Sequence, residues 1–313
     1  MSNRVAVIFD FDDTLAEDST AALINTFAPP PPEPNPEKKK ASQFFYDEAG
    51  ELVSTGWDPP LAYLTLLSDK IKRGDLPAIT RKDLQQVGRE HVVVYEGAAE
   101  CLSELREKFQ GDKEIQKAKL TLEFYIVSGG IGDIIRSTPI AVNGLFNQIW
   151  ACELDYDERG VVSRPKSTIS FTEKTRYLFL INKGISREES NESPYDVNNE
   201  MPENDRDIPF SHMFYVGDGP SDIPCISLIH KMTGRKDNTL IVYGEKTVHK
   251  AWEIGANRGR TAPRDYQNWA KKNIMEGVLR VGQDAAKEII GKREKHLSKD
   301  VGYGSKKQKK KDR

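Results

Sequence analysis

Two acidic side chains, Asp10 and Asp12, stand directly after an apolar run at residues 5–9. A run of this length suits a buried strand of a parallel sheet, so both carboxylates are predicted where such sheets bind ligands, at a strand end. Two close carboxylates repel each other, and they gain most from a shared divalent cation or from dividing the acid and base roles. The alternative is an ordinary acidic turn, for which Asp and Thr14 are common residues.

One reaction that paired carboxylates can carry out is phosphoryl transfer through an aspartate. Besides the carboxylates, this reaction needs hydrogen-bond donors, a cation and another metal ligand. A second apolar run, at residues 122–127, leads into Ser128 and Gly129. The serine offers a short hydroxyl donor, and glycine lets its backbone N–H approach an anion without a side chain in the way. The pattern therefore predicts a site for a phosphate oxygen, although a strand-to-helix turn with Ser128 as N-cap is the alternative.

The required cation is predicted to be Lys174, which opens an expected helix with Tyr177, Leu178 and Ile181 on one face. In a chain with 46 Lys and Arg residues most lysines are solvated, so only the position of this lysine before the helix distinguishes it. Lys166 is the competing candidate.

A third apolar run, at residues 213–216, ends in a Gly-Asp-Gly turn around Asp218, with Asp222 four residues later. Flanking glycines permit a tight turn that aims the carboxylate into a crevice, and hard oxygen ligands suit Mg²⁺. A plain β-turn is the alternative.

Together these stretches resemble the four motifs of the haloacid dehalogenase-like (HAD) superfamily of hydrolases. Ser-Gly-Gly at residues 128–130 resembles the phosphoserine-phosphatase branch in particular. The resemblance covers a few dozen of the 313 residues. It implies an α/β fold, with a Rossmann-like doubly wound parallel sheet as the core and an inserted helical cap domain.

The resemblance also implies an activity: Mg²⁺-dependent hydrolysis of a small phosphorylated metabolite through an aspartyl-phosphate. Asp10 would be the nucleophile and Asp12 the general acid and then the base. Asp222 would orient Lys174 or a metal-bound water, and Thr14 would fix the loop. The implied site residues are Asp10, Asp12 and Lys174 for catalysis; Thr14, Ser128, Gly129 and Lys174 for phosphate; and Asp10, Asp12, Asp218 and Asp222 for the metal.

The substrate is less defined than the reaction. Family members that act on phosphoserine usually carry a glutamate nine residues after the nucleophile, where this chain has Ser19 next to Asp18, and Ala and Asn where Pro220 and Ser221 stand. Phosphoserine phosphatase proper and a phosphotransferase or mutase therefore stay open. A dehalogenase is disfavoured, because that branch lacks the second aspartate, Asp12. A non-catalytic binding protein on the same fold is the remaining alternative.

About 80 residues separate the first motif from a helix near Glu96, far more than the roughly 2 to 6 of an ordinary strand-to-helix loop. We predict a core at 1–15 and 95–290, a helical cap with a proline-rich segment at 16–94, and a basic tail at 291–313. Closing a cap would exclude water and present substrate-selecting side chains. By location alone, the candidates for that role are Trp57, Tyr63, Arg73, Arg81 and Arg89.

Local patterns predict several further elements. Helical spacing and a possible N-cap at Thr80 predict cap helices at 60–73 and 80–91. Residues 149–162 are predicted to form a β-hairpin and residues 239–243 a strand. After residue 246 the pattern predicts helix, with an interruption at 261–264. The polar region 186–207 is expected to be a mobile loop, the prolines at 29–36 an extended segment, and the basic residues 305–313 disordered.

Composition limits the classes of partner. The chain is 37% hydrophobic and 30% charged, with a net charge of −2, which gives no general attraction to nucleic acid. No apolar stretch approaches the roughly 18 residues of a membrane span, which excludes ion-pumping ATPases that share the aspartate chemistry. The first strand leaves no room for a signal peptide, and three dispersed cysteines suit reduced thiols, so a cytoplasmic location is expected.

Overall fold

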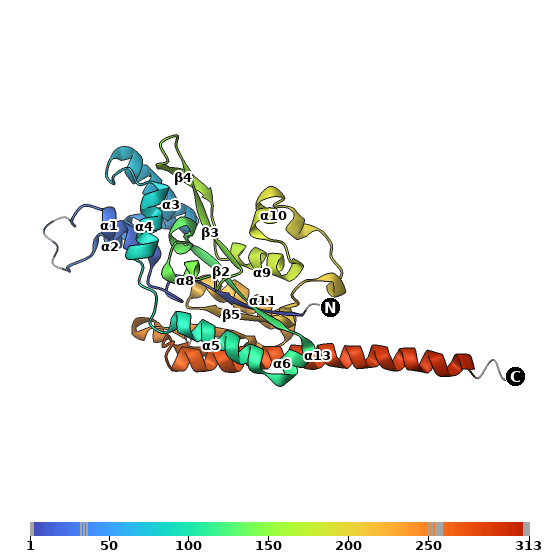
Figure 1. The fold of residues 1–313 in the computed structure, drawn as a ribbon. Helices are drawn as coiled ribbons and strands as arrows, with labels where there is room; N and C mark the ends of the chain where they lie inside the picture. Colours follow the sequence, from blue (N-terminus) through green and yellow to red (C-terminus); the bar gives the residue numbers. More distant parts are fainter. Residues whose placement is uncertain are drawn as a thin grey trace.

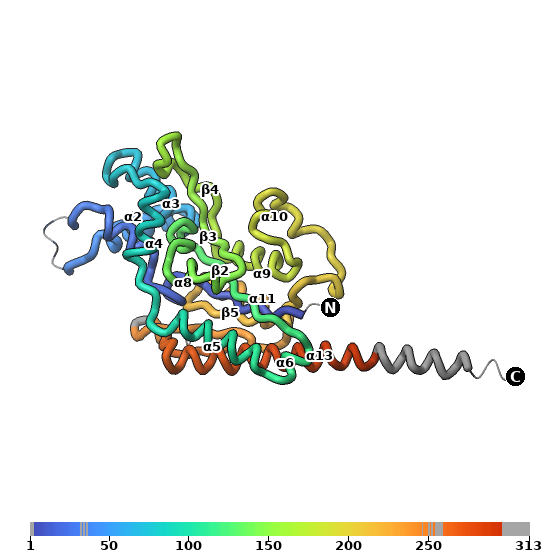
Figure 2. Tube along the Cα trace, viewed as in Figure 1, coloured from blue at the N-terminus to red at the C-terminus, as the bar shows by residue number. Residues whose placement is uncertain are grey.

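A computed structural model describes residues 3–31, 33, 35, 37–249, 251, 253 and 259–308 (Figures 1 and 2). Within this part of the chain seven strands form one sheet in the order β4–β3–β2–β1–β5–β6–β7. Neighbouring strands are parallel except β3 and β4, which are antiparallel. The strands are β1 Arg4–Phe9, β2 Thr121–Ile131, β3 Gln148–Tyr156, β4 Val162–Ser167, β5 Met213–Gly217, β6 Thr239–Tyr243 and β7 Arg260–Pro263.

Helices cover both faces of the sheet, which confirms the predicted doubly wound α/β class. Figure 1 shows α5, α6 and α13 together on one face, whereas α9 and α11 contact each other and the sheet from the other. The helices of the described residues are α1 Ser19–Phe27, α2 Ala41–Ser54, α3 Pro59–Arg73, α4 Arg81–Glu90, α5 Ala98–Gly111, α6 Lys113–Ala118, α7 Gly132–Ile135, α8 Pro139–Val142, α9 Glu173–Lys183, α10 Arg187–Glu192, α11 Ile223–Thr233 and α13 Trp269–Gln308.

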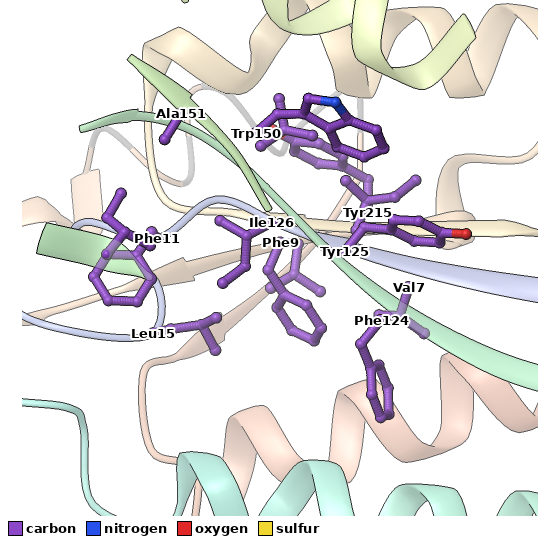
Figure 3. Packing of buried hydrophobic residues seen from close by; sticks show 14 of the residues in the cluster. Val7, Phe9, Phe11, Leu15, Phe124, Tyr125, Ile126, Trp150, Ala151 and Tyr215 are labelled. Atoms are coloured by element: carbon purple, nitrogen blue, oxygen red, sulfur yellow. The ribbon is translucent and has the colours of Figure 1, made fainter. Parts of the chain in front are cut away.

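The three central strands bring the predicted motifs to one edge of the sheet. Every residue of the run 5–9 is fully buried, as expected for a strand covered on both faces. Phe9 pairs with Ile126 of β2 on one side and with Val216 of β5 on the other. Figure 3 shows Phe9 packed among apolar residues of these strands, with its ring centroid 6.4 Å from that of Phe124. The residues that follow each strand therefore emerge together.

Helices α1 to α4 form a group beyond this edge, next to the β3–β4 hairpin (Figure 1). The predicted helices at 60–73 and 80–91 are confirmed as α3 and α4. Asp58 caps the start of α3, and Thr80 forms a capping box with Asp83 at the start of α4. An antiparallel bridge between Ala16 and Val94 brings together the two points where the predicted cap leaves and rejoins the core. The domain boundaries themselves stay a prediction.

The predicted interruption of the helical pattern at 261–264 is confirmed: the edge strand β7 lies there and pairs with β6. Two other local predictions differ from the structure. Residues 186–207 were expected to be a loop, but Ser186 caps the short helix α10 and two 3-10 turns follow it. Residues 305–308 were expected to be disordered but continue α13, since Lys and Gln are good helix formers and extending an existing helix is easier than starting one.

Parts of other predicted segments lie outside the described residues. These are 32, 34 and 36 of the proline-rich segment, 250, 252 and 254–258 of the predicted helix after 246, and 309–313 of the tail. The predicted hairpin is confirmed by the pairing of β3 with β4, and the strand at 239–243 is confirmed as β6.

Cys101, Cys152 and Cys225 are buried and free of disulfides. Among the described helices none is both long enough and apolar enough to cross a bilayer.

Two glycines of α13 offer a test of how tightly this helix packs on the sheet. A Cβ at Gly277 would overlap the ring of Phe214 on β5, whereas a Cβ at Gly291 would meet no heavy atom within 4 Å. We expect Gly277→Ala to lower the free energy of unfolding by about 1 to 3 kcal/mol through overpacking. Gly291→Ala should raise it by up to about 1 kcal/mol, because alanine favours a helix. Denaturant unfolding measures both, and equal stabilisation by the two variants would contradict the packing.

Candidate active site

The predicted motifs meet around one pocket of about 270 Å³ at the ends of β1, β2 and β5. The predicted site residues that line it are Asp10, Asp12, Ser128, Gly129, Lys174 and Asp218. Thr14 and Asp222 do not line the pocket and are buried. The exposed Lys166 of β4 is also outside the lining, so the structure places Lys174 rather than its competitor at the site.

Asp10 is held at the base of the pocket by a backbone donor and by a lysine. Its Oδ1 accepts from the N–H of Phe11 at 2.7 Å, and its Oδ2 lies 2.8 Å from Nζ of Lys174. Burial raises the pKa of Asp10 to about 6; the lysine charge opposes the rise, and the negative charge of Asp222 adds to it. At neutral pH Asp10 is therefore mostly ionised, with one carboxylate face anchored.

Lys174 is buried between two carboxylates. It is 2% exposed, and its Nζ lies 2.8 Å from Asp10 Oδ2 and 2.9 Å from Asp222 Oδ1. Burial by itself lowers the pKa of Lys174, but the two carboxylates outweigh that effect and hold the pKa above its ordinary value. The ammonium therefore stays charged and can face a phosphoryl group.

The carboxylate of Asp222 accepts four hydrogen bonds and thereby holds neighbouring groups in place. Its Oδ1 accepts from Lys174 and, at 2.6 Å, from the hydroxyl of Tyr215. Its Oδ2 accepts from the backbone N–H groups of Asp218 at 3.0 Å and Gly219 at 3.1 Å. A carboxylate has about four acceptor sites, so this geometry favours the predicted orienting role over direct metal ligation. The same packing requires glycine at 217, where a Cβ would overlap the Asp222 side chain.

An acidic cluster lies beside Lys174: single oxygens of Asp10, Asp218 and Asp222 all lie within 4.8 Å of one another. With the oxygens of Asp222 engaged by hydrogen bonds, Asp10 and Asp218 are the members of the cluster that fit a hard divalent cation. Burial raises the pKa of Asp218 to about 8, neighbouring carboxylates including Asp222 and Asp10 add to the rise, and Lys174 opposes it. This excess of negative charge around one lysine suits Mg²⁺, which prefers oxygen ligands.

Asp12 is held by the start of α1. Its Oδ1 accepts from the N–H of Ser19 at 2.8 Å. Burial raises the pKa of Asp12 well above its usual range, and the Asp18 carboxylate adds to the rise. Glycine is required at 130, because a Cβ there would overlap Asp12 Oδ2. A buried carboxyl that retains its proton is suited to donate it to a departing group.

The last residues of β2 connect the core to the helices above it. Ser128 is 1% exposed, and its Oγ accepts from the N–H of Gly130 at 3.0 Å. The carbonyl of Gly129 accepts from the hydroxyl of Tyr63 on α3, and from Sγ of Cys152 at 3.1 Å. Tyr63 is thus both a pocket residue and a tie between α3 and the end of β2.

The remaining pocket residues show what the sequence did and did not reveal. Of the five candidates named by location, Tyr63 lines the pocket, and Trp57, Arg73, Arg81 and Arg89 do not. Sequence reasoning assigned no role to the following lining residues: Asp13, Asp18, Thr20, Tyr46, Pro59, Pro60, Gly130, Ile169, Phe171 and Ser221. Asp18 carried a detectable signal, because it is the N-cap of α1. Tyr46 carried none, since its hydroxyl reaches Asp18 at 2.8 Å only through the packing of α2 on α1.

A distant segment holds the loop between β1 and α1. Asp13 has a φ of 54°, in the left-handed region that non-glycine residues seldom occupy. Nη1 of Arg264 donates to the Asp13 carbonyl and, at 3.0 Å, to its Oδ1, while the guanidinium lies 4.2 Å from the ring centroid of Tyr95. The Tyr266 hydroxyl donates to the Thr14 carbonyl at 2.9 Å. These contacts fix the loop that carries Asp12.

Comparison with known proteins places the chain by its fold. No family model matches the sequence. An uncharacterized protein of Borreliella burgdorferi is 25% identical over 297 residues, which are 88% of this chain and 98% of the relative. A gene product of Archaeoglobus fulgidus has a TM-score of 0.50 at 12% identity, over 88% of this chain and 85% of that one. A HAD family hydrolase of Salmonella enterica serovar Typhi has a TM-score of 0.49 at 11% identity, over 88% and 70%.

A phosphoserine phosphatase structure has a TM-score of 0.44 at 13% identity, over 77% of this chain and 87% of that one. The sheet and its flanking helices confirm the predicted doubly wound α/β class, and at these identities the likeness to solved structures concerns the fold alone.

The raised pKa of Asp218 predicts a pH-dependent stability of the metal-free protein. The folded state favours the protonated carboxyl, so this contribution to the free energy of unfolding is largest below the ordinary pKa of 3.8 and is lost as pH rises toward about 8. Asp218→Asn should therefore stabilise the metal-free protein progressively more between pH 5 and pH 8, by at most about 1.4 kcal/mol per pH unit.

Unfolding in urea at each pH, with chelator present, measures the difference in free energy of unfolding between variant and parent, in which titrating groups that do not interact with Asp218 cancel. Added Mg²⁺ should stabilise the parent more than the variant. A difference that stays constant with pH would contradict the predicted protonation of Asp218.

Proposed function

We propose that this chain is a Mg²⁺-dependent phosphomonoester hydrolase that works through an aspartyl-phosphate on Asp10. The observation that carries the proposal is the buried Lys174, bridged between Asp10 and Asp222, in a pocket that also contains Ser128 and the raised-pKa carboxyl of Asp12. A buried charge network of this kind in a pocket is typical of a catalytic site rather than of surface ion pairing.

The side chains divide the reaction between them. The ionised carboxylate of Asp10 would attack the phosphorus atom while Asp12 donates its proton to the departing alcohol oxygen. Asp12, now a carboxylate, would take a proton from the water that cleaves the acyl phosphate. Ser128 and Lys174 would donate to the phosphoryl oxygens, which holds the group in line with Asp10.

Asp10 and Asp218, with the Asp12 carbonyl, would hold Mg²⁺, and Asp222 would position the turn that carries Asp218. The ion would offset negative charge on the phosphoryl oxygens.

The pocket supports a small phosphorylated metabolite as the substrate. Its volume of about 270 Å³ accommodates a phosphoryl group and a modest leaving group. Tyr63 and Phe171 line the pocket together with residues of the core. We propose that α1 to α4 act as the cap, with Tyr63 linking their position to the end of β2.

The direct test is release of inorganic phosphate from a generic aryl phosphate by the purified protein. We expect release that requires Mg²⁺ and falls by at least about a thousandfold in Asp10→Asn, because an amide cannot act as the nucleophile. Lys166→Met is the matched surface control for Lys174→Met: the first should retain full activity and the second should lose nearly all of it.

Full activity in Asp10→Asn would refute the nucleophile assignment. Failure of the unmodified protein to hydrolyse a broad panel of phosphorylated metabolites would favour a binding role on the same fold.

The contact of Arg264 with Asp13 predicts a role in positioning the catalytic loop. Arg264→Met should reduce kcat by roughly tenfold, which corresponds to about 1.4 kcal/mol, with little change in KM, because the loop loses its anchor while the phosphate donors stay in place. Arg260→Met, which removes an arginine paired with Glu276 on the surface, is the control. Steady-state kinetics with thermal melts separate the two effects; unchanged kcat in a folded Arg264→Met protein would remove the positioning role.

A further inference from the structure

We infer that this chain binds a small oxyanion of the phosphate class in a second cavity, of about 160 Å³, between β3, α9 and α10. None of the residues that line it also lines the pocket described above. The residues that carry the inference are Trp150, Glu153, Arg176, Arg187, Ser190 and Asn191. The inference does not depend on the proposed hydrolase activity.

An unpartnered donor in the cavity wall is the first observation. Trp150 is 4% exposed and lines the cavity, yet its Nε1–H has no hydrogen-bond partner among the described residues. The indole is held firmly, stacked on Tyr125 with 15° between the rings and packed against Tyr177 at 5.7 Å between centroids. Figure 3 shows its nitrogen on the side of the ring away from the labelled apolar residues. Since the indole can only donate and an unmet buried donor is costly, the group that completes it must be an acceptor.

The charges around the cavity favour an anionic acceptor. Glu153 accepts from Nη1 and Nη2 of Arg136 at 2.9 Å and from Nη2 of Arg187 at 2.9 Å. Asp133 lies 3.9 Å from Arg136 and 3.6 Å from Arg81. In this group of ion pairs three arginines meet two carboxylates, which leaves one positive charge. Arg187 is the one of the three that lines the cavity.

Other residues that line the cavity supply a second guanidinium, from Arg176, and small polar groups. Arg176 lies 2.9 Å from Glu173 and donates to the carbonyl of Pro194 at 3.2 Å and to Ser190 Oγ at 3.4 Å. Ser190 and Asn191 of α10 complete this lining. A guanidinium fork matches the oxygen geometry of phosphate and carboxylate. At roughly 30 Å³ per water, the cavity has space for about five waters, the size of one small oxyanion group.

The cavity is linked to the candidate active site through β3. Two residues after Trp150, Sγ of Cys152 donates to the Gly129 carbonyl at 3.1 Å and accepts from the N–H of Ile169 at 3.2 Å. Gly129 and Ile169 both line the active-site pocket. An anion bound to the Trp150 N–H would therefore contact β3, the strand whose Cys152 holds the Gly129 carbonyl.

Calorimetric titration of the full chain with inorganic phosphate, in chelator and without Mg²⁺, tests the inference. To remove binding at the active-site pocket, the titration is made in Lys174→Met. We expect one phosphate per chain in this background, with Kd raised at least tenfold when Trp150→Phe or Arg187→Gln is added. Trp150→Phe keeps an aromatic ring at this position and removes the N–H together with part of the indole, so thermal melts of each variant check that the fold is retained. Arg164→Gln, which changes an exposed arginine of β4 paired with Asp155, should leave Kd unchanged.

Two further arms define the ligand. Glycerol 3-phosphate that binds with the same dependence on Arg187 would identify a phosphate ester, and phosphate alone would identify the free ion; either result supports an oxyanion site. No binding by either in Lys174→Met, or binding that Trp150→Phe and Arg187→Gln both leave unchanged in the folded protein, would overturn the inference. If Lys174→Met itself does not fold, Asp10→Asn serves as the background, and the Arg187-dependent component of phosphate binding is the quantity compared.

Discussion

The candidate site depends on a buried positive charge held between two negative ones. A charge in the interior of a protein is costly unless it is paired and hydrogen-bonded, so Lys174, Asp10 and Asp222 stabilise one another only in this geometry. The three residues come from the position after β1, from the start of α9 and from the turn after β5. Removal of Lys174 would leave two buried carboxylates uncompensated, so the packing of these elements and the chemistry of the pocket are coupled.

The same pocket contains more negative charge than one lysine can balance. Burial and mutual repulsion raise the pKa values of Asp10, Asp12 and Asp218 together. This arrangement costs stability in the absence of a cation and becomes favourable when one binds, which is a common compromise between stability and function at catalytic sites. In the proposed mechanism the raised pKa of Asp12 has a separate use, because a general acid must retain its proton at neutral pH.

Residues that are distant in sequence hold those parts of the pocket that the motifs do not position by themselves. The hydroxyl of Tyr63, on α3, donates to the carbonyl of Gly129, so the helices above the pocket and the end of β2 are joined directly. Arg264, from the segment between β7 and α13, holds Asp13 in a left-handed backbone conformation that non-glycine residues seldom occupy. Rigid support of this kind keeps reacting groups in a productive arrangement.

The sequence by itself determined the three central strands and the identity of Asp10, Ser128 and Asp218 as pocket residues, because a continuous apolar run predicts a buried parallel strand, and parallel strands carry the residues at their ends to one edge of a sheet. Lys174 was predicted from its place at the start of a helix. Helices α3 and α4 were also predicted, since their spacing and caps are local signals.

Only the tertiary structure decided the roles of residues whose partners are far away in the sequence. These residues include Tyr46, Trp150, Asp222 and Arg264. Asp222 orients its neighbours because it accepts four hydrogen bonds, and Arg264 contacts a residue 251 positions earlier. The Trp150 N–H is buried without an acceptor. All three features arise from packing between elements. No local pattern encodes them, because hydrogen-bond geometry and burial are properties of the assembled fold.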